Sequence, residues 1–310
     1  MENKTYYFSS KGYVSSAVLL YDCANIRVEN LEITNEPEIF GERYDQGDKM
    51  NRTGVAVVAQ NGGTLENITL TRLYVHGVKG NVYDKHMNNG GIYCTALKPK
   101  KEDGEIARYH RLRIEKCGVE NCSRWGIAAG YSYTHSHFTT AKLPETIVKT
   151  YGHTEVVIEH NLVKNIGGDG ITVMYCFQPL VQYNVSEKAA MEINDKIYTE
   201  AGARQGKTAA AIWPWKCKDA LFQYNEAYHT CDNQDGQACE MDWHHQSEYF
   251  TYRHNRYVGY ENVPGEDGEA KETELTEQEK TALEECKGTQ NIKKLLQAFG
   301  QLPGIDKSVE

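Results

Sequence analysis

The sequence predicts an all-β fold, a right-handed parallel β-helix built as a single-stranded solenoid with long loop insertions. Three observations lead to this prediction: the composition, a loose internal repeat, and an asparagine at one position of the later repeats. The chain of 310 residues contains 21 Tyr and 27 Gly but only 7 Pro, a balance that favours strands and turns over long helices. A chain of this length can bury a large core.

Seven segments share an alternating apolar pattern and define the predicted coils. They begin at Asn25, Asn67, His110, Glu155, Pro179, Asp219 and Glu248. Strands that alternate with period two and recur without hairpin turns indicate parallel stacking at ~4.8 Å per coil. A β-sandwich, the alternative, would place Asn-Gly or Asp-Gly turns between paired strands. Here Asp-Gly precedes a strand of the same repeat, which favours the solenoid.

Placing the first strand of each repeat in register aligns one column of residues. The column contains Leu31, Leu73, Cys117, Asn161, Asn184, Asn225 and Asn255. In stacked coils an inward asparagine can donate to one equivalent residue and accept from the next, which satisfies a buried amide. The column therefore predicts an asparagine ladder through the later coils.

The spacing between repeats is uneven, which predicts three long insertions. They run over about 84–108, 132–152 and 186–207. Loops of this kind on a rigid solenoid commonly build the binding face.

The composition changes near the end of the predicted β-helix domain, which covers residues 1–262. Residues 263–310 are charged and helix-prone, with Thr276 and Glu279 spaced as a capping box. We expect a helical cap or tail there, because an uncovered last coil would leave an unpaired strand edge.

Charge and cysteine content exclude several classes of protein. Lys and Arg number 34 against 43 Asp and Glu, a net charge of −9 that argues against a nucleic-acid partner. No apolar run approaches the ~20 residues of a membrane helix, and the first residues lack the pattern of a signal peptide. The 9 cysteines form no CxxC pair, which predicts small buried hydrophobic residues. We expect a monomer.

Two aspartates occupy the same predicted corner of different coils. Asp169 lies in GGDGITV and Asp235 in QDGQACEM, with one coil between them. That arrangement puts their backbones roughly 9–10 Å apart. Cleavage of a glycosidic bond uses two carboxylates ~5–9.5 Å apart, and the wide end of the range favours inversion. An aspartate at such a corner can instead bond turn amides.

Glu240 and Asp242 follow Asp235 on alternate positions of the same predicted strand, so both can face one side. Either could replace Asp235 as acid or nucleophile, unless this side is simply a solvated strand face. The candidate catalytic residues are therefore Asp169, Asp235, Glu240 and Asp242.

The predicted substrate contacts come from aromatic and basic residues near these corners. Trp125, Trp213 and Trp215 can stack against sugar rings or fill the core, and Lys216 lies directly after the last of them. His244 lies on the same side of its strand as the two alternative carboxylates. We expect it to contact a sugar or a carboxylate.

No cofactor or metal is expected. Cys239, His244 and Asp235 lack any recognisable spacing for zinc ligands. The oxygen-rich stretch around Asp235 leaves calcium open as an alternative.

Four runs carry a resemblance to a known group: GGDGITV, AAIWPWKCKDALFQYNEAYHT, DGQACEMDW and FTYRHNRY. They resemble the right-handed parallel β-helix proteins of bacterial polysaccharide-utilisation systems, and they are most similar to glycoside hydrolases of that fold with α-L-fucosidase or xylanase activity. The resemblance covers about residues 20–262. It implies carbohydrate hydrolysis with Asp169 and Asp235 as catalysts. It also implies an extracytoplasmic (periplasmic or secreted) location.

Two other functions remain open from the residues. A polysaccharide lyase of this fold would need a base such as Lys216 and a cation or basic cluster to neutralise a uronate. A non-catalytic glycan-binding solenoid would use the same aromatic residues without turnover.

Overall fold

The computed structural model describes residues 5–9, 12–36, 51–80, 89–138, 143–193, 208–231, 251–253 and 256–258. The predicted all-β class is confirmed in these residues, where strands dominate and form three sheets. The helices in the described chain are η1 (His135–Phe138), a 3-10 helix, and α1 (Glu145–Tyr151).

The three sheets are named A, B and C. Sheet A contains β1 (Thr5–Ser9), β2 (Gly12–Tyr21), β5 (Asn51–Ala59), β8 (Gly90–Ala96), β11 (Trp125–Ser132), β15 (Asp169–Met174) and β19 (Ile212–Trp215). Sheet B contains β3 (Ile26–Glu29), β6 (Thr64–Thr71), β9 (Arg108–Glu115), β12 (His153–Thr154), β13 (Val157–Glu159), β16 (Cys176–Phe177), β17 (Leu180–Gln182), β20 (Leu221–Gln223) and β22 (Thr251–Arg253). Sheet C contains β4 (Glu32–Thr34), β7 (Tyr74–His76), β10 (Gly118–Glu120), β14 (Leu162–Lys164), β18 (Val185–Glu187), β21 (Glu226–Tyr228) and β23 (Arg256–Val258).

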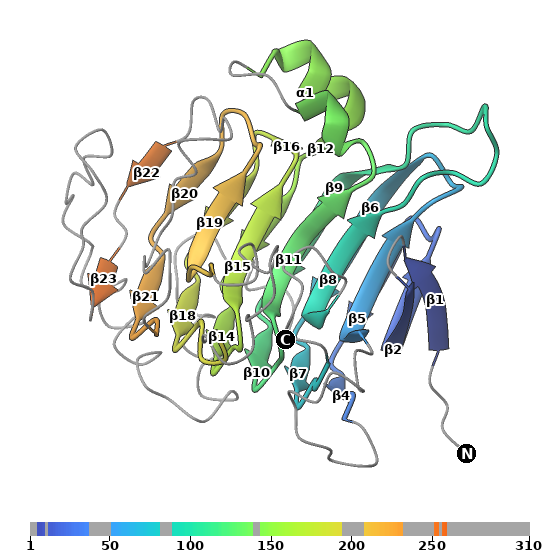
Figure 1. Cartoon of the computed structure of the whole chain (residues 1–310). Helices are drawn as coiled ribbons and strands as arrows, with labels where there is room; N and C mark the ends of the chain where they lie inside the picture. Colours follow the sequence, from blue (N-terminus) through green and yellow to red (C-terminus); the bar gives the residue numbers. More distant parts are fainter. Residues whose placement is uncertain are drawn as a thin grey trace, which may run out of the picture.

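The chain visits the sheets in the order A, B, C and then begins again. We call one such passage a circuit; β5, β6 and β7 make one, and β8, β9 and β10 make the next. Strands of successive circuits lie side by side along the molecule (Figure 1). In sheet A the strands β2, β5, β8, β11, β15 and β19 pair in parallel, whereas β1 pairs antiparallel with β2. The parallel stacking predicted from the repeat is thus present.

The connection from sheet B to sheet C has the same form in the circuits from β3 to β21. It consists of two residues, as at His160 and Asn161 between β13 and β14. The first residue is left-handed, with a φ of 56° at His160 and 53° at Tyr183, and from the second circuit on the second residue is buried. A single left-handed residue turns the chain sharply without lengthening it.

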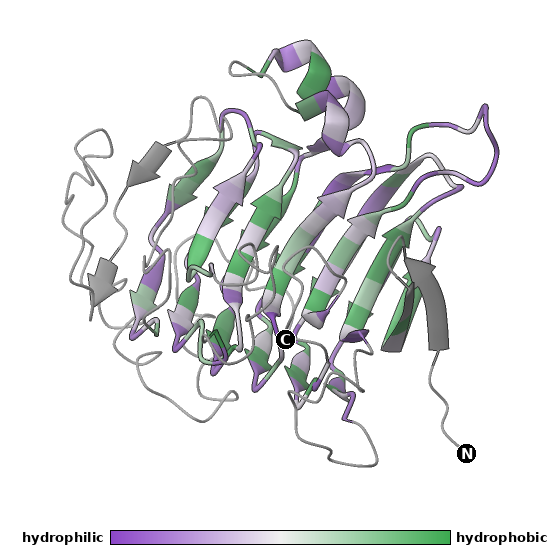
Figure 2. Cartoon of the chain, in the orientation of Figure 1, coloured by the Kyte–Doolittle hydropathy of each residue, from purple (hydrophilic) through white to green (hydrophobic). Residues whose placement is uncertain are grey.

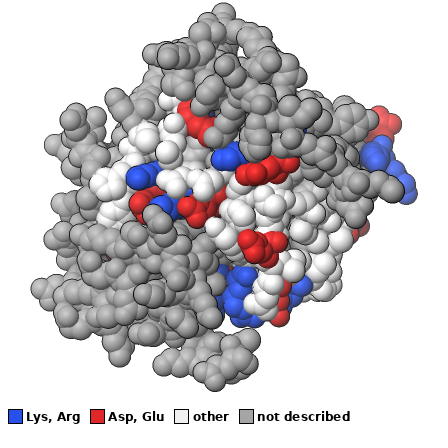
Figure 3. All heavy atoms as spheres, turned by 90° about the horizontal axis from the view of Figure 1, so that it is seen from below, with Lys and Arg blue, Asp and Glu red and all other residues white. Residues whose placement is uncertain are grey.

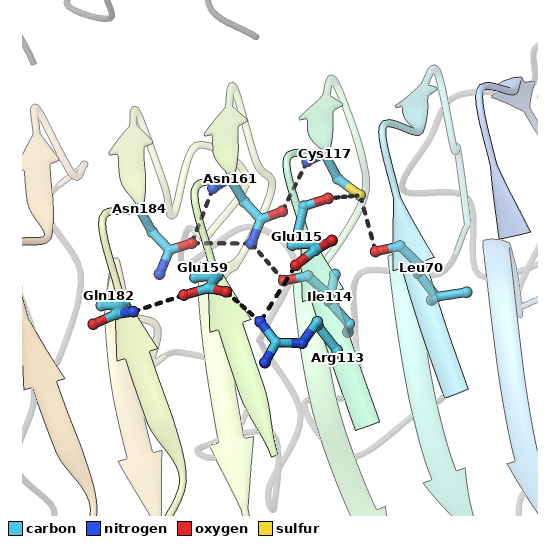
Figure 4. Close-up of polar contacts among 9 residues, drawn as sticks. All are labelled: Leu70, Arg113, Ile114, Glu115, Cys117, Glu159, Asn161, Gln182 and Asn184. Carbon is cyan, nitrogen blue, oxygen red and sulfur yellow. Dashed lines mark hydrogen bonds and ion pairs between the residues drawn. The ribbon is translucent and has the colours of Figure 1, made fainter. Parts of the chain in front are cut away.

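The inward residues of these connections form the predicted asparagine ladder. Asn161 Nδ2 donates to Asn184 Oδ1 at 3.0 Å, and Asn184 Nδ2 donates to Asn225 Oδ1 at 2.9 Å. The Oδ1 of each of these asparagines also accepts a backbone N–H from the preceding circuit. For Asn161 Oδ1 the donor is the N–H of Cys117, at 2.9 Å. Figure 4 shows the section of the ladder from Cys117 through Asn161 to Asn184. Asn255, the last predicted member, lies outside the described residues.

Beneath the ladder, the outer side of sheet B carries a chain of polar side chains. Arg113 pairs with Glu159, which accepts from Gln182 Nε2 at 2.6 Å (Figure 4). Gln182 in turn accepts from Gln223 Nε2 at 2.7 Å. Acidic and basic residues are interspersed on the face seen in Figure 3, without separation by sign among the residues described there.

The interior is apolar and runs the length of the sheets. Its residues include Val57, Ile92, Ile127, Ile171 and Ile212, one from each of five sheet A strands, and none of them is more than 1% exposed. Hydrophobic and hydrophilic residues share most strands (Figure 2). The core therefore forms a column between the sheets.

One expected insertion is shorter than predicted. Residues 84–108 contain β8, whose burial pattern shows every residue buried. β5 is likewise buried along nearly all its length. Strands buried on both faces are almost continuously apolar and show no alternation, so the repeat pattern did not reveal them. The insertion after β8 covers only the residues between Ala96 and Arg108.

The insertion expected over 132–152 is present and contains η1 and α1, which lie above the sheets in Figure 1. The insertion expected over 186–207 falls largely outside the described residues, as does the predicted helical segment 263–310. Within the described chain, no helix is long and apolar enough to cross a membrane.

Most of the described cysteines are buried, as predicted: Cys94, Cys117, Cys122, Cys176 and Cys217. Cys23 and Cys231 are instead partly exposed. Burial raises the pKa of the Cys117 thiol to about 12, so this thiol is a packing group rather than a nucleophile. Cys239 and Cys286 lie outside the described residues.

Candidate active site

Sheet A has two sides with different contents. Ile171 pairs with Ile212, and both point into the interior core. Thr172 pairs with Trp213, which points the opposite way, as expected for neighbouring residues in a strand. On this outer side an outer aromatic cluster forms from Tyr93, Trp125, Ala128, Phe138, Leu143, Val148, Met174, Tyr175, Ala210, Trp213 and Trp215.

The predicted corner of Asp169 is present, and its register is as expected. Trp125 pairs with Asp169 between β11 and β15. The Asp169 side chain is 0% exposed. Its Oδ1 accepts the backbone N–H of Ala210 at 3.0 Å and the indole Nε1–H of Trp213 at 2.9 Å. The bond to Ala210 is the turn-amide contact that the sequence left open as the alternative for this aspartate.

The second oxygen of Asp169 faces a buried cation. Arg124 Nη2 lies 3.3 Å from Asp169 Oδ2, and both side chains are 0% exposed. The same Nη2 donates to the backbone oxygen of Thr208 at 2.8 Å. Arg124 itself is left-handed, with a φ of 54°, and its side chain reaches the next circuit. The ion pair therefore joins the corner of β11 to the corner of β15.

Gly168 makes this close approach sterically feasible. A Cβ placed there would lie 2.3 Å from the Arg124 carbonyl oxygen and 3.0 Å from its Nη1. A side chain at this position would clash with the Arg124 backbone and crowd its guanidinium. The glycine before the aspartate in GGDG therefore gives the ion pair the space it needs.

The three predicted tryptophans are packed together and largely buried. Trp125 is 0% exposed, Trp213 3% and Trp215 9%. The Trp125 and Trp213 rings are stacked at 6.5 Å and 23°. Of the two uses left open for them, packing is what the described chain shows. Contact with a ligand remains a proposal.

Trp215 adjoins a partly exposed aromatic group that the sequence reasoning missed. His135 lies 5.4 Å from Trp215 and 5.8 Å from Tyr131, measured between ring centroids. His135 Nδ1 lies 2.9 Å from the hydroxyl of Tyr175. Burial raises the pKa of Tyr175 well above its ordinary value, so this phenol stays neutral. No repeat signal marks these residues, because His135 lies in an insertion.

Lys216, expected to contact substrate, is 3% exposed. Its Nζ donates to the backbone oxygen of Phe138 at 2.8 Å and lies 5.1 Å from the centroid of the Trp215 ring. Lys218 Nζ donates to Leu143 O at 3.4 Å. Both lysines therefore fasten the 132–152 insertion to sheet A. An ammonium held in this way is poorly suited to act as the base of a lyase.

The remaining predicted site residues, Asp235, Glu240, Asp242 and His244, lie outside the described residues. In the chain they fall between β21 of sheet C and β22 of sheet B. That interval holds the sheet A strand in each earlier circuit. Among the described residues, no group of three or more His, Cys, Asp or Glu could hold a metal ion.

Arg124 is the most informative residue that sequence reasoning missed. It lies directly before Trp125, which the repeat placed beside Asp169. The register alone could therefore have indicated a cation near that carboxylate.

Three relatives found by comparison with known proteins carry the same name, lacto-N-biosidase. No family model matches the chain. A lacto-N-biosidase from Bifidobacterium longum subsp. longum is 40% identical over 268 residues, which represent 76% of this chain and 17% of that protein. The crystal structure of a GH136 lacto-N-biosidase from Eubacterium ramulus matches with a TM-score of 0.75 and 53% identity over 80% of this chain and 40% of the other. The native crystal form matches with the same TM-score, 54% identity and coverage of 79% and 39%.

These relatives are glycoside hydrolases, in agreement with the expected class. None of the three is described as a fucosidase or xylanase, and none as a lyase. The chain spans about 17% of the length of the curated relative and 40% of the solved one. Over that span it is a homologue of GH136 lacto-N-biosidases.

Proposed function

We propose that this chain carries the carbohydrate-cleaving region of a glycoside hydrolase of the lacto-N-biosidase type, acting on an oligosaccharide. We propose further that its circuits form a right-handed parallel β-helix. The observation that carries the functional proposal is the 53% identity over 80% of this chain to a GH136 lacto-N-biosidase. The outer aromatic cluster supports it, because aromatic faces beside carboxylates suit a sugar ring.

The reacting carboxylates are proposed to come from Asp235, Glu240 and Asp242. Asp169, the fourth candidate, is buried and has both oxygens engaged within the protein. A group that donates a proton to a glycosidic oxygen must reach that oxygen. The three other carboxylates lie on one short stretch, in the interval of the chain where a sheet A strand is expected. One would protonate the leaving oxygen and another would act as base or nucleophile.

Binding roles are proposed for the residues around this stretch. Trp215, the most exposed of the three tryptophans at 9%, is proposed to contact the sugar. Trp213 and Trp125 are proposed to support it from within the same aromatic cluster. Lys216 holds the insertion that forms part of this cluster, and His244 contacts the substrate directly.

The test is turnover of an aryl lacto-N-bioside by the full chain, followed by variants of the three carboxylates. Asp235→Asn, Glu240→Gln and Asp242→Asn are compared with Asp219→Asn, a matched change in the turn before β20. We expect two of the three to lower kcat by ~10²–10⁴, with Asp219→Asn unchanged. Substrate binding without turnover in the unmodified chain would instead indicate a glycan-binding module. The anomeric form of the first product distinguishes inversion from retention.

Hydrolysis by two carboxylates needs no metal, so we propose a reaction without a cofactor. Activity should be unchanged by EDTA. A loss that calcium restores would favour the oxygen-ligand site that the sequence left open. We also propose an extracytoplasmic, monomeric protein, to be tested by fractionation of cells and by light scattering.

A further inference from the structure

Asp169 lies where two neighbouring strands of sheet A, β15 and β19, meet. It begins β15, it accepts the N–H of Ala210 two residues before β19, and it accepts the indole N–H of Trp213 within β19. Asp169 therefore fixes both the backbone and one side chain of the neighbouring strand.

Asp22 provides a useful comparison, because it also crosses from one circuit to the next. Its Oδ1 accepts the backbone N–H groups of Gln60 at 2.6 Å and Asn61 at 3.0 Å. Those bonds close a turn and involve no aromatic side chain of sheet A. Asp169 differs from Asp22 because it accepts a hydrogen bond from the indole of Trp213.

The orientation of Asp169 is itself held by Arg124. The guanidinium lies 3.3 Å from Asp169 Oδ2 and also bonds Thr208 O. Because both charged side chains are fully buried, the ion pair experiences little screening by solvent. The arrangement restricts Asp169 to the rotamer in which Oδ1 faces Trp213.

Trp213 is the residue that this network holds in place, 3% exposed within the outer aromatic cluster. Its ring stacks on Trp125 at 6.5 Å, and its indole N–H is occupied by Asp169 rather than available for other partners. An indole pinned at its N–H and on one face has little rotational freedom left. A fixed Trp213 in turn fixes the aromatic cluster around it, and a pre-organised binding surface loses less entropy when a ligand binds.

We propose that Asp169 is a positioning residue: supported by Arg124, it fixes the Trp213 indole on the outer side of sheet A. The use of that indole in substrate binding rests on the proposed function. Asp169 acts through Trp213 and does not touch the glycosidic bond.

The positioning itself is tested without any activity. The chain has 4 Trp, so a ¹⁵N–¹H spectrum contains few indole signals, and Trp213→Phe assigns the one from Trp213. We expect Asp169→Asn, which breaks the ion pair but keeps an acceptor, to shift this signal and to speed its hydrogen exchange about tenfold or more. The matched Asp22→Asn variant should leave it unchanged. An unaltered Trp213 signal in Asp169→Asn would refute the proposal.

The role in binding is tested by kinetics on the aryl lacto-N-bioside. Asp169→Asn and Trp213→Phe should both raise KM about tenfold while kcat stays within about threefold. The double variant should be no worse than the more affected single variant, because both changes act on one ring. A fall in kcat of ~10² or more in Asp169→Asn, with Trp213→Phe normal, would show instead that Asp169 reacts directly.

The two measurements separate the possible failures. If the unmodified chain shows no turnover, the proposed function fails, yet the indole signal still decides what Asp169 does. If turnover is present and the Trp213 indole signal is unchanged in Asp169→Asn, only the positioning role fails.

Discussion

The asparagine ladder and the Asp169 corner both bury polar side chains, but they do so in opposite ways. In the ladder each residue repeats its neighbour, so every amide finds an equivalent partner one circuit away. At the corner Arg124, Asp169 and Trp213 are all different, and each contact occurs once. Repetition provides hydrogen-bond partners for the buried amides of the scaffold. A single buried ion pair carries a desolvation penalty, so its presence calls for a role other than stability.

The largest expected effect on the free energy of unfolding comes from removing the Arg124–Asp169 ion pair. Arg124→Met leaves the Asp169 carboxylate buried without its cation, and loss of one partner of a buried pair costs about 3–5 kcal/mol. Urea denaturation should show this fall in the free energy of unfolding. The double variant Arg124→Met with Asp169→Asn should regain part of it, since no uncompensated charge remains. A double variant as unstable as the sum of the single ones would contradict the pairing.

Breaking the ladder should cost somewhat less. Asn184→Leu removes an acceptor for the Asn161 amide and a donor to Asn225. Unsatisfied buried groups cost about 1–3 kcal/mol each. Because the Asn161 amide keeps Ile114 O as an acceptor and Asn225 Oδ1 keeps the backbone N–H of residue 184 as a donor, we expect a total loss of only about 2–3 kcal/mol in the same measurement. Turnover at a temperature where the variant is folded should be unchanged. A selective loss of activity would mean that the ladder is more than scaffold.

A third prediction concerns pH. Burial lowers the pKa of His153 from 6.5 to about 3, and its Nδ1 accepts the N–H of Tyr109. Between pH 6.5 and about pH 3, His153 binds a proton in the unfolded chain but not in the folded chain. Stability from His153 is therefore complete above pH 6.5 and is lost as pH falls toward 3, by at most about 1.4 kcal/mol per pH unit.

The measurement is the denaturation midpoint between pH 7 and pH 4. His153→Gln, which cannot titrate, should show a shallower fall than the parent chain, with His137→Gln as an exposed control. Equal slopes in all three proteins would contradict the assignment to His153.

The smallest effect is expected on the outer side of sheet B. Arg113 pairs with Glu159, but its side chain is 43% exposed. Exposed pairs contribute about 0–1 kcal/mol, so Arg113→Ala should change the free energy of unfolding by less than 1 kcal/mol. Raising the salt concentration should reduce even that difference. A loss comparable to that of Asn184→Leu would show that this polar chain is a second ladder.

The same contrast explains what the sequence could and could not reveal. The column from Cys117 to Asn225 was readable because repeats align, and the pairing of Trp125 with Asp169 followed from that register. β8 was missed because a strand buried on both faces loses the alternation on which the repeat depends.

The site was less predictable than the fold. The carboxylate of Asp169 was found, but not its burial, because burial depends on Arg124 and on the approach that Gly168 permits. His135 and Tyr175 meet across an insertion, and no periodicity in the chain records that contact.

The two-residue connection between sheets B and C has a consequence for how such a scaffold can vary. In the circuits from β3 to β21 the chain passes from B to C through two residues, the first of them left-handed, so there is no room for extra chain at that edge. In this part of the chain added segments enter where it joins or leaves sheet A, as between β8 and β9 or β11 and β13. Length variation among proteins of this build should therefore accumulate around sheet A. Insertion mutagenesis would tolerate new peptides there and reject them at the opposite edge.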